Sequence, residues 1–182
     1  MKTKFQAIAN TATLEQLISA QEWYEEARDL AVDMTELGDI TFDQACCIIA
    51  TYSIKQRWER NEELALRFAQ GERGLPAMGA VNRIADNVMA FDDPYAALNG
   101  QKTNAFAHNI AGDLESVTID VWMLKASEVD HKKSPSRKLY TEISESVVEA
   151  SLEGVTCNGK VVFLKPAQYQ ALVWIIIRGA AK

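Results

Sequence analysis

Apolar residues recur three and four positions apart along almost the whole chain, and this spacing restricts the fold more than any other feature. One stripe runs from Leu14 through Trp23 to Met34, and similar stripes follow at intervals toward the C-terminus. Such spacing places side chains on one face of an α-helix, whereas a half-buried strand needs strict alternation. The sequence therefore predicts an all-α fold of about eight helices.

Capping residues at helix starts, and glycine or proline at helix ends, set the expected bounds. The expected helices cover residues 14–37, 42–53, 54–70, 81–89, 103–110, 121–127, 135–153 and 166–179. The segment 42–53 follows Thr41 as N-cap and is almost wholly apolar, which predicts a buried central helix. The exception is "VTCNGKVVF", residues 155–163, where β-branched runs flank Asn158-Gly159 and predict one small β-hairpin.

The composition excludes several classes of protein. With 48% hydrophobic and 24% charged residues, the chain has enough apolar surface for a core, so disorder is not expected. No apolar run approaches the length of about 18 residues that a membrane span needs, and the N-terminus lacks a signal peptide's apolar segment. Cys46, Cys47 and Cys157 fit neither a disulfide framework nor the spacing of a zinc or iron–sulfur site. We therefore expect a cytoplasmic protein with buried thiols, no membrane partner, no metal and no cofactor.

Charge is unevenly distributed along the chain. The net charge of −6 argues against a protein that coats nucleic acid through bulk electrostatics. The segment "HKKSPSRK", residues 131–138, is different because it holds four Lys or Arg residues and one His without an acid. A solvated loop before a helix is the ordinary explanation, and a local phosphate-binding patch is the alternative.

Two single charges stand at expected helix starts. Lys102 follows the tight turn Asn99-Gly100, and Asp120 follows the apolar run "VTI". A surface lysine and an N-capping aspartate are the ordinary explanations. However, glycine supplies positive φ in such a turn, and the amides of the helix behind it can hold a phosphate. Either charge alone is a weak signal, and the position of Asp120 relative to Lys102 is what favours a phosphate-binding site over the ordinary explanations.

Residues 98–125, "LNGQKTNAFAHNIAGDLESVTIDVWMLK", resemble the helix-hairpin-helix DNA glycosylase superfamily of the endonuclease III type. In that family a hairpin "LPGxGxKTA" precedes an apolar helix and then "VDTHxxR". Gly100, Lys102 and Thr103 match the hairpin motif, and Asp120 matches the catalytic aspartate at the spacing of the lysine-bearing members. The resemblance implies that Lys102 is an amine nucleophile and Asp120 the essential carboxylate, with Lys125 in place of the arginine.

A second stretch, "IIATYSIKQRWERNEELALRFAQG", resembles the helix–loop–helix that precedes this hairpin. Over most of residues 42–178 the chain is similar to small glycosylase-like proteins of bacteriophages. The resemblance implies a base pocket formed by Tyr52, Ser53, Trp58, Asn61 and Trp122. A place in the core is the alternative for Trp58 and for Asn61, although a buried amide would need hydrogen-bond partners.

The resemblance also implies contacts with the DNA backbone. The residues expected to make them are Gly100, Gln101, Thr103, Lys125, Lys132, Lys133, Arg137 and Lys138. The chain departs from the family pattern in lacking the proline and second glycine of the turn, the histidine (replaced by Trp122) and the cluster-binding cysteines. We therefore expect a reduced glycosylase-like helical fold over residues 1–182. This fold forms either a single domain or two lobes. The first lobe would be residues 40–130, which contain the hairpin motif at 96–120, and the second would combine residues 1–39 with 131–182.

Three functions remain open. The first is a DNA N-glycosylase with AP-lyase activity through Lys102, acting on a damaged or modified base flipped out of the stack. The second is a phage DNA-hypermodification enzyme of the same superfamily that remodels a 5-substituted thymine. The third is a non-catalytic helix-hairpin-helix module that binds DNA or a host protein, which the negative net charge favours. DNA is the expected partner, a monomer is the default, and the compartment is the bacterial cytoplasm, in an infected cell if a phage encodes the chain.

Overall fold

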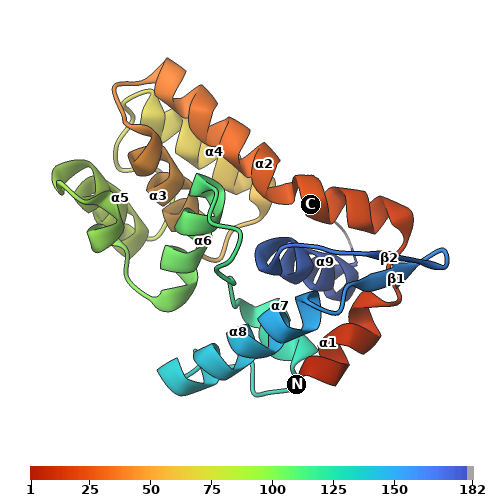
Figure 1. Ribbon diagram of the computed structural model, residues 1–182. Helices are drawn as coiled ribbons and strands as arrows, with labels where there is room; N and C mark the ends of the chain where they lie inside the picture. Colours follow the sequence, from red (N-terminus) through yellow and green to blue (C-terminus); the bar gives the residue numbers. More distant parts are fainter. Residues whose placement is uncertain (180–182) are drawn as a thin grey trace. The chain divides into compact units, whose positions relative to one another are not determined.

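The computed structural model describes residues 1–179, which form helices and one small antiparallel sheet (Figure 1). In chain order the elements are α1 (Lys2–Ala9), α2 (Leu14–Leu37), α3 (Phe42–Tyr52), α4 (Trp58–Ala69), α5 (Gly79–Ala90), the 3₁₀ helix η1 (Pro94–Ala97), α6 (Gln101–Ala111), α7 (Val121–Ala126), α8 (Arg137–Ser151), β1 (Val155–Cys157), β2 (Lys160–Val162) and α9 (Pro166–Arg178). This mainly helical architecture confirms the expected all-α class. None of the helices in residues 1–179 is both long enough and apolar enough to span a membrane.

The chain divides into two compact units. The middle unit is Glu25–Gly112, and the terminal unit combines Met1–Tyr24 with the chain from Asp113 onward. The boundary between Tyr24 and Glu25 falls inside α2, and the boundary after Gly112 follows the end of α6. These bounds differ from the lobes 40–130 and 1–39 with 131–182 that we expected from the sequence. Lys102 therefore belongs to the middle unit and Asp120 to the terminal unit.

The middle unit is built around α3, which packs against α4, α5, α6 and η1 (Figure 1). Every residue from Ala45 to Tyr52 is buried, as the apolar sequence of this segment predicts. Thr41 caps the helix in a capping box, because its side chain accepts from the Gln44 amide and the Gln44 side chain accepts from the Thr41 amide. Burial raises the pKa of the Cys46 thiol to about 12, so this thiol stays protonated and unreactive at neutral pH.

The terminal unit packs α9 against α1, α7 and α8. Most of α9 is buried, in agreement with its apolar sequence. The hairpin expected around Asn158-Gly159 is present, with Val155 paired to Val162 and Cys157 to Lys160. Asn158 and Gly159 have φ values of 50° and 73°, the left-handed conformation that these residue types tolerate in a tight hairpin turn.

Two elements differ from the sequence expectation. Helix α1 was missed, because it offers only Phe5 and Ala9 as buried residues and so carries a weak periodic signal. The helix expected from residue 54 begins at Trp58 instead, and Ile54 lies in the connection between α3 and α4. Lys55 adopts φ 58° there, which interrupts a helix, and neither glycine nor proline marks the break in the sequence.

Candidate functional site

The turn before Lys102 places a glycine in a left-handed backbone conformation. The short helix η1 ends at Ala97, and Gly100 has φ 98°, a conformation that side chains other than glycine rarely adopt. Helix α6 then begins at Gln101, and its N-cap residue, Gly100, has no side chain that could cap it. The amide end of α6 carries partial positive charge, so a phosphate is favoured beside Gly100 and Gln101.

Lys102 lies in the first turn of α6 and is half-buried. Its Nζ donates to Ser53 Oγ at 3.2 Å, and it lies 5.5 Å from the centre of the Phe106 ring. Ser53 is the C-cap residue of α3, and its hydroxyl donates in turn to the carbonyl of Ala50 at 2.7 Å. The fold of the middle unit therefore brings together two residues of the predicted site that are 49 positions apart in the chain.

Tyr52, next to Ser53, points into the packing of the middle unit. It is 1% exposed, its ring lies 5.9 Å from that of Phe68, and its hydroxyl donates to Asn82 Oδ1 at 3.2 Å. Burial raises the pKa of Tyr52 to about 12. Asn82, which accepts the hydrogen bond of Tyr52, is itself held in place because its Nδ2 donates to the carbonyl of Leu75 at 2.8 Å. Tyr52 therefore has the contacts of a core tyrosine.

Asn61 is the unusual member of the predicted pocket. It lies on the buried stripe of α4 with Trp58 and Phe68, and only 1% of it is exposed. Neither its Nδ2 nor its Oδ1 has a hydrogen-bond partner among residues 1–179. A buried amide without partners costs free energy, so Asn61 lowers the stability of the free protein.

Asp120 is the N-cap of α7 in the terminal unit. Its Oδ1 accepts from the amides of Trp122 and Met123 at 2.9 and 3.0 Å, and its Oδ2 accepts from Trp174 Nε1 at 3.0 Å. These three donors hold both carboxylate oxygens in place, so the carboxylate is oriented as well as negatively charged. The ordinary explanation of Asp120 as a helix cap is thus confirmed, and it does not exclude a chemical role.

Trp174 and Tyr140 support Asp120 and were not identified from the sequence. The ring of Trp174 packs against Trp23 with centroids 5.0 Å apart. Tyr140 holds the segment before Asp120, because its hydroxyl donates to the carbonyl of Val117 and accepts from the amide of Ile119. Trp174 lies on the apolar helix α9 and Tyr140 on the buried face of α8, and the polar contact of one aromatic side chain leaves no signal in the spacing of apolar residues.

The remaining predicted residues of the terminal unit form two groups. Lys125 Nζ lies 3.9 Å from the centre of the Trp122 ring, a cation–π contact that covers this indole. Lys132, Lys133, Arg137 and Lys138 are all exposed. Arg137 and Lys138 lie in the first turn of α8, which contains no acidic residue. Their positive charges therefore lie at the end of the helix that itself carries partial positive charge. A bound anion would relieve this repulsion.

The structure thus gathers Lys102 with Ser53 in one unit and Asp120 with Trp122 and Trp174 in the other. Lys102 and Asp120 belong to different units, and their pairing stays a prediction. Within residues 1–179 no cluster of three or more His, Cys, Asp or Glu side chains is arranged to hold a metal ion.

A family model matches residues 1–181, and its description is a family of unknown function, DUF7178. No curated protein and no solved structure matches the chain.

Proposed function

The chain belongs to the family of unknown function DUF7178, and from its own residues we propose that it excises a damaged or modified base from DNA, with Lys102 as the nucleophile. The contact that carries the proposal is the hydrogen bond of 3.2 Å from Lys102 Nζ to Ser53 Oγ. It positions an amine at the start of α6, directly behind the glycine turn that suits a phosphate.

Chemically, the amine must first lose a proton, because only the neutral form attacks carbon. Lys102 Nζ then forms a bond to C1′ of the nucleotide while the bond from C1′ to the base breaks. The base leaves with the bonding electron pair and takes up a proton, and opening of the sugar ring gives a Schiff base between Lys102 and C1′. Loss of a proton from C2′ and of the phosphate from C3′ then forms a C2′–C3′ double bond and breaks the strand, which accounts for the AP-lyase activity. Water then releases the lysine.

Asp120 has a distinct role in this proposal. As the base departs, positive charge develops on the sugar, and an oriented carboxylate stabilises that charge. The three N–H donors around Asp120 keep its oxygens fixed, so little reorganisation is needed during the reaction. The exposed lysines and Arg137 of the 131–138 segment supply further contacts to the phosphates.

An oligonucleotide with one abasic site tests the nucleophile without knowledge of the base. Borohydride reduces a Schiff base to a stable covalent adduct, which a denaturing gel detects. We expect the wild type to be trapped, and Lys102→Ala to lower the yield by about tenfold or more, because the attacking amine is gone. Lys160→Ala is the control, since Lys160 is an exposed lysine on β2. Equal trapping of Lys102→Ala and the wild type would overturn the assignment of the nucleophile.

Asp120→Asn tests the carboxylate on duplexes that each carry one altered base. We expect turnover to fall by about a hundredfold or more, because the negative charge is lost. The new amide would also present N–H groups to Trp174 Nε1, so Trp174→Phe serves as a second background in which this clash is absent. A loss of activity in both backgrounds supports the electrostatic role, whereas full activity would contradict it.

Mass spectrometry of the digested DNA separates the proposal from the other two functions. Release of a free base is the expected product. A changed base substituent without strand scission or trapped adduct would indicate the remodelling enzyme, and unchanged DNA bound by the protein would indicate the non-catalytic module.

A further inference from the structure

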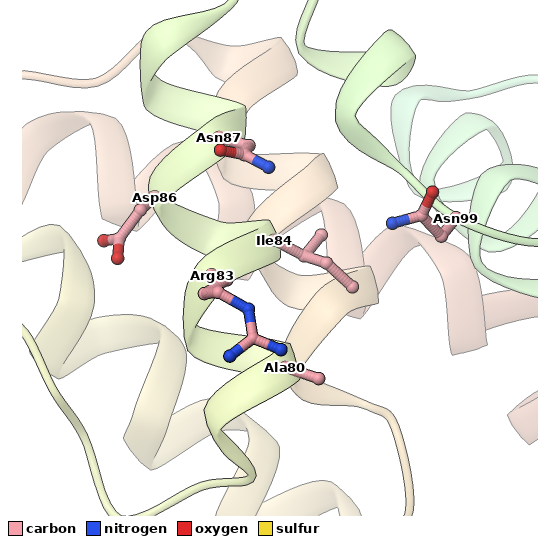
Figure 2. A pocket seen from close by; sticks show the side chains of 6 residues that line it. All are labelled: Ala80, Arg83, Ile84, Asp86, Asn87 and Asn99. Atoms are coloured by element: carbon pink, nitrogen blue, oxygen red, sulfur yellow. The ribbon is translucent and has the colours of Figure 1, made fainter.

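A pocket of about 430 Å³ lies in the middle unit between helix α5 and the turn that precedes Lys102 (Figure 2). Five of its lining residues come from α5 and the sixth, Asn99, comes from the turn; they are Ala80, Arg83, Ile84, Asp86, Asn87 and Asn99. Its volume falls within the range of ordinary small-molecule sites. None of these six residues belongs to the site described above, and Asn99 is the direct neighbour of Gly100.

The charged side chain that faces into this pocket is Arg83 (Figure 2). Arg83 is exposed, and its guanidinium makes no ion pair or hydrogen bond with any residue from 1 to 179. The one acid in the lining, Asp86, points away from Asn99 in Figure 2 and lies 3.9 Å from the guanidinium of Arg73. Arg83 therefore offers five N–H donors and a full charge to whatever enters the pocket.

The surroundings of Arg83 also favour an anion. Its guanidinium turns back over the first turn of α5, with Nη1 4.0 Å from the position that a Cβ on Gly79 would occupy. That turn contains no acidic residue and has no side-chain cap. The positive end of the helix and the guanidinium thus lie close together, which is unfavourable unless a negative group is bound between or beside them.

The rest of the lining suits the remainder of a nucleotide. The carboxamides of Asn87 and Asn99 face the pocket from opposite sides (Figure 2), and each offers two N–H donors and a carbonyl acceptor. Ile84 and Ala80 add apolar side chains to the lining, against which a sugar ring can pack. The charged and amide side chains are exposed, so the pocket is an open groove that a continuous strand can enter.

We propose that this pocket binds one nucleotide of the DNA strand next to the nucleotide whose phosphate lies at the Gly100 turn. The phosphate lies on Arg83, the sugar packs on Ile84 and Ala80, and the two carboxamides hold the remaining polar atoms. The inference rests on the proposed function, since it takes DNA as the ligand. It assigns to Arg83 and Asn99 the task of fixing the register of the strand before the reacting nucleotide reaches Lys102.

Binding of unmodified duplex DNA by Arg83→Ala tests this pocket without any catalytic step. We expect the dissociation constant to rise by about tenfold at low salt, because a charge-assisted contact to phosphate is lost. The slope of log K against log salt concentration should fall by about one, as expected for one phosphate contact. Arg67→Ala is the matched control: it removes the same charge from the same unit, but Arg67 is already paired with Glu72 at 2.8 Å. It should change the affinity by less than about twofold.

Asn99→Asp provides a second variant that keeps the turn, because Asp-Gly turns are as favourable as Asn-Gly turns. It places a negative charge opposite Arg83 and should weaken binding by about tenfold with an unchanged circular dichroism spectrum. Unchanged affinity and salt slope in both variants, in a protein that binds DNA, would overturn the pocket and leave the proposed function standing.

Binding measurements on the wild type and titration with a free nucleotide test the two assumptions of the proposal, that the protein binds DNA and that the pocket takes a strand. If the wild type binds no DNA, both the pocket assignment and the proposed function are wrong. Titration with a deoxynucleoside monophosphate distinguishes the source of the phosphate. We expect only weak binding of the free nucleotide, and Arg83-dependent binding of the nucleotide without Arg83-dependent binding of DNA would overturn the assignment to a strand.

Discussion

At the scale of single residues, the buried amide of Asn61 costs stability, and we propose that it contacts the extruded base. Its amide is 1% exposed and makes no hydrogen bond within residues 1–179, although it shares the stripe of α4 with Trp58 and Phe68. An apolar side chain of similar size would fill the same space without the cost of removing an amide from water. A polar group retained at such a cost is expected where a ligand supplies its partners.

Asn61→Leu should therefore raise the free energy of unfolding, by about 1–3 kcal/mol, because the cost of the buried amide disappears. The same variant should lose most of its activity on DNA, if the amide contacts the extruded base. Urea unfolding followed by circular dichroism measures the first effect, and the base-release assay measures the second. A stability loss of more than about 1 kcal/mol would show that the amide is already satisfied in the free protein.

At the scale of elements, α3 carries the middle unit, since α4, α5, α6 and η1 all pack against it. Its C-terminal end presents Ser53 to Lys102, so the position of the amine depends on where this helix ends. Its start is fixed by the reciprocal hydrogen bonds between Thr41 and Gln44, at 2.9 and 3.2 Å. The cap at one end of α3 therefore supports the site at the other.

Thr41→Ala should lower the free energy of unfolding by about 1 kcal/mol, because the amide of Gln44 loses its side-chain acceptor. Thr41→Ser keeps a hydroxyl at the same position and should stay within about 0.5 kcal/mol of the wild type. Chemical denaturation of the three proteins under one set of conditions measures the differences. Equal losses in both variants would assign the effect to the methyl group of Thr41 rather than to the cap.

At the scale of the whole molecule, burial raises the pKa of all five tyrosines, which are distributed over both units. Burial raises the pKa values of Tyr52 and Tyr140 to about 12 and raises those of Tyr24, Tyr95 and Tyr169 as well. In the unfolded chain each hydroxyl ionises near pH 10. Above that pH the unfolded state loses protons that the native state keeps, so the native state becomes less stable.

We therefore expect the protein to lose stability as the pH rises from about 10 to about 12, by about 1.4 kcal/mol per pH unit for each protected tyrosine. Absorbance at the tyrosinate band should stay low until the fold is lost and then rise in one cooperative step that coincides with the loss of helical circular dichroism. In denaturant the same tyrosines should titrate near pH 10. A tyrosine that ionises near pH 10 in a protein with unchanged helical signal would contradict the prediction.

Much of the fold was predictable because it depends on local patterns. The helices around Thr41, Asp120 and Pro166, the buried character of α3 and the hairpin at Asn158-Gly159 all follow from spacing, caps and turn residues that are read within one segment. The break between α3 and α4 was missed because Lys55 adopts a left-handed conformation without a glycine to mark it. Helix α1 was missed because its two buried residues are too few to form a stripe.

The sequence by itself determined the helical class, the glycine turn before Lys102 and the cap at Asp120, because patterns within a few neighbouring residues specify all three. Only the tertiary structure decided which partners these charges have: Ser53 for Lys102 and Trp174 for Asp120. It also decided that Arg83, in the pocket with Asn99, makes no ion pair with any residue from 1 to 179. Such contacts join residues 49 and 54 positions apart. They depend on how helices pack. A spacing of three and four residues indicates which face of a helix is buried, but it does not indicate which other helix packs against that face.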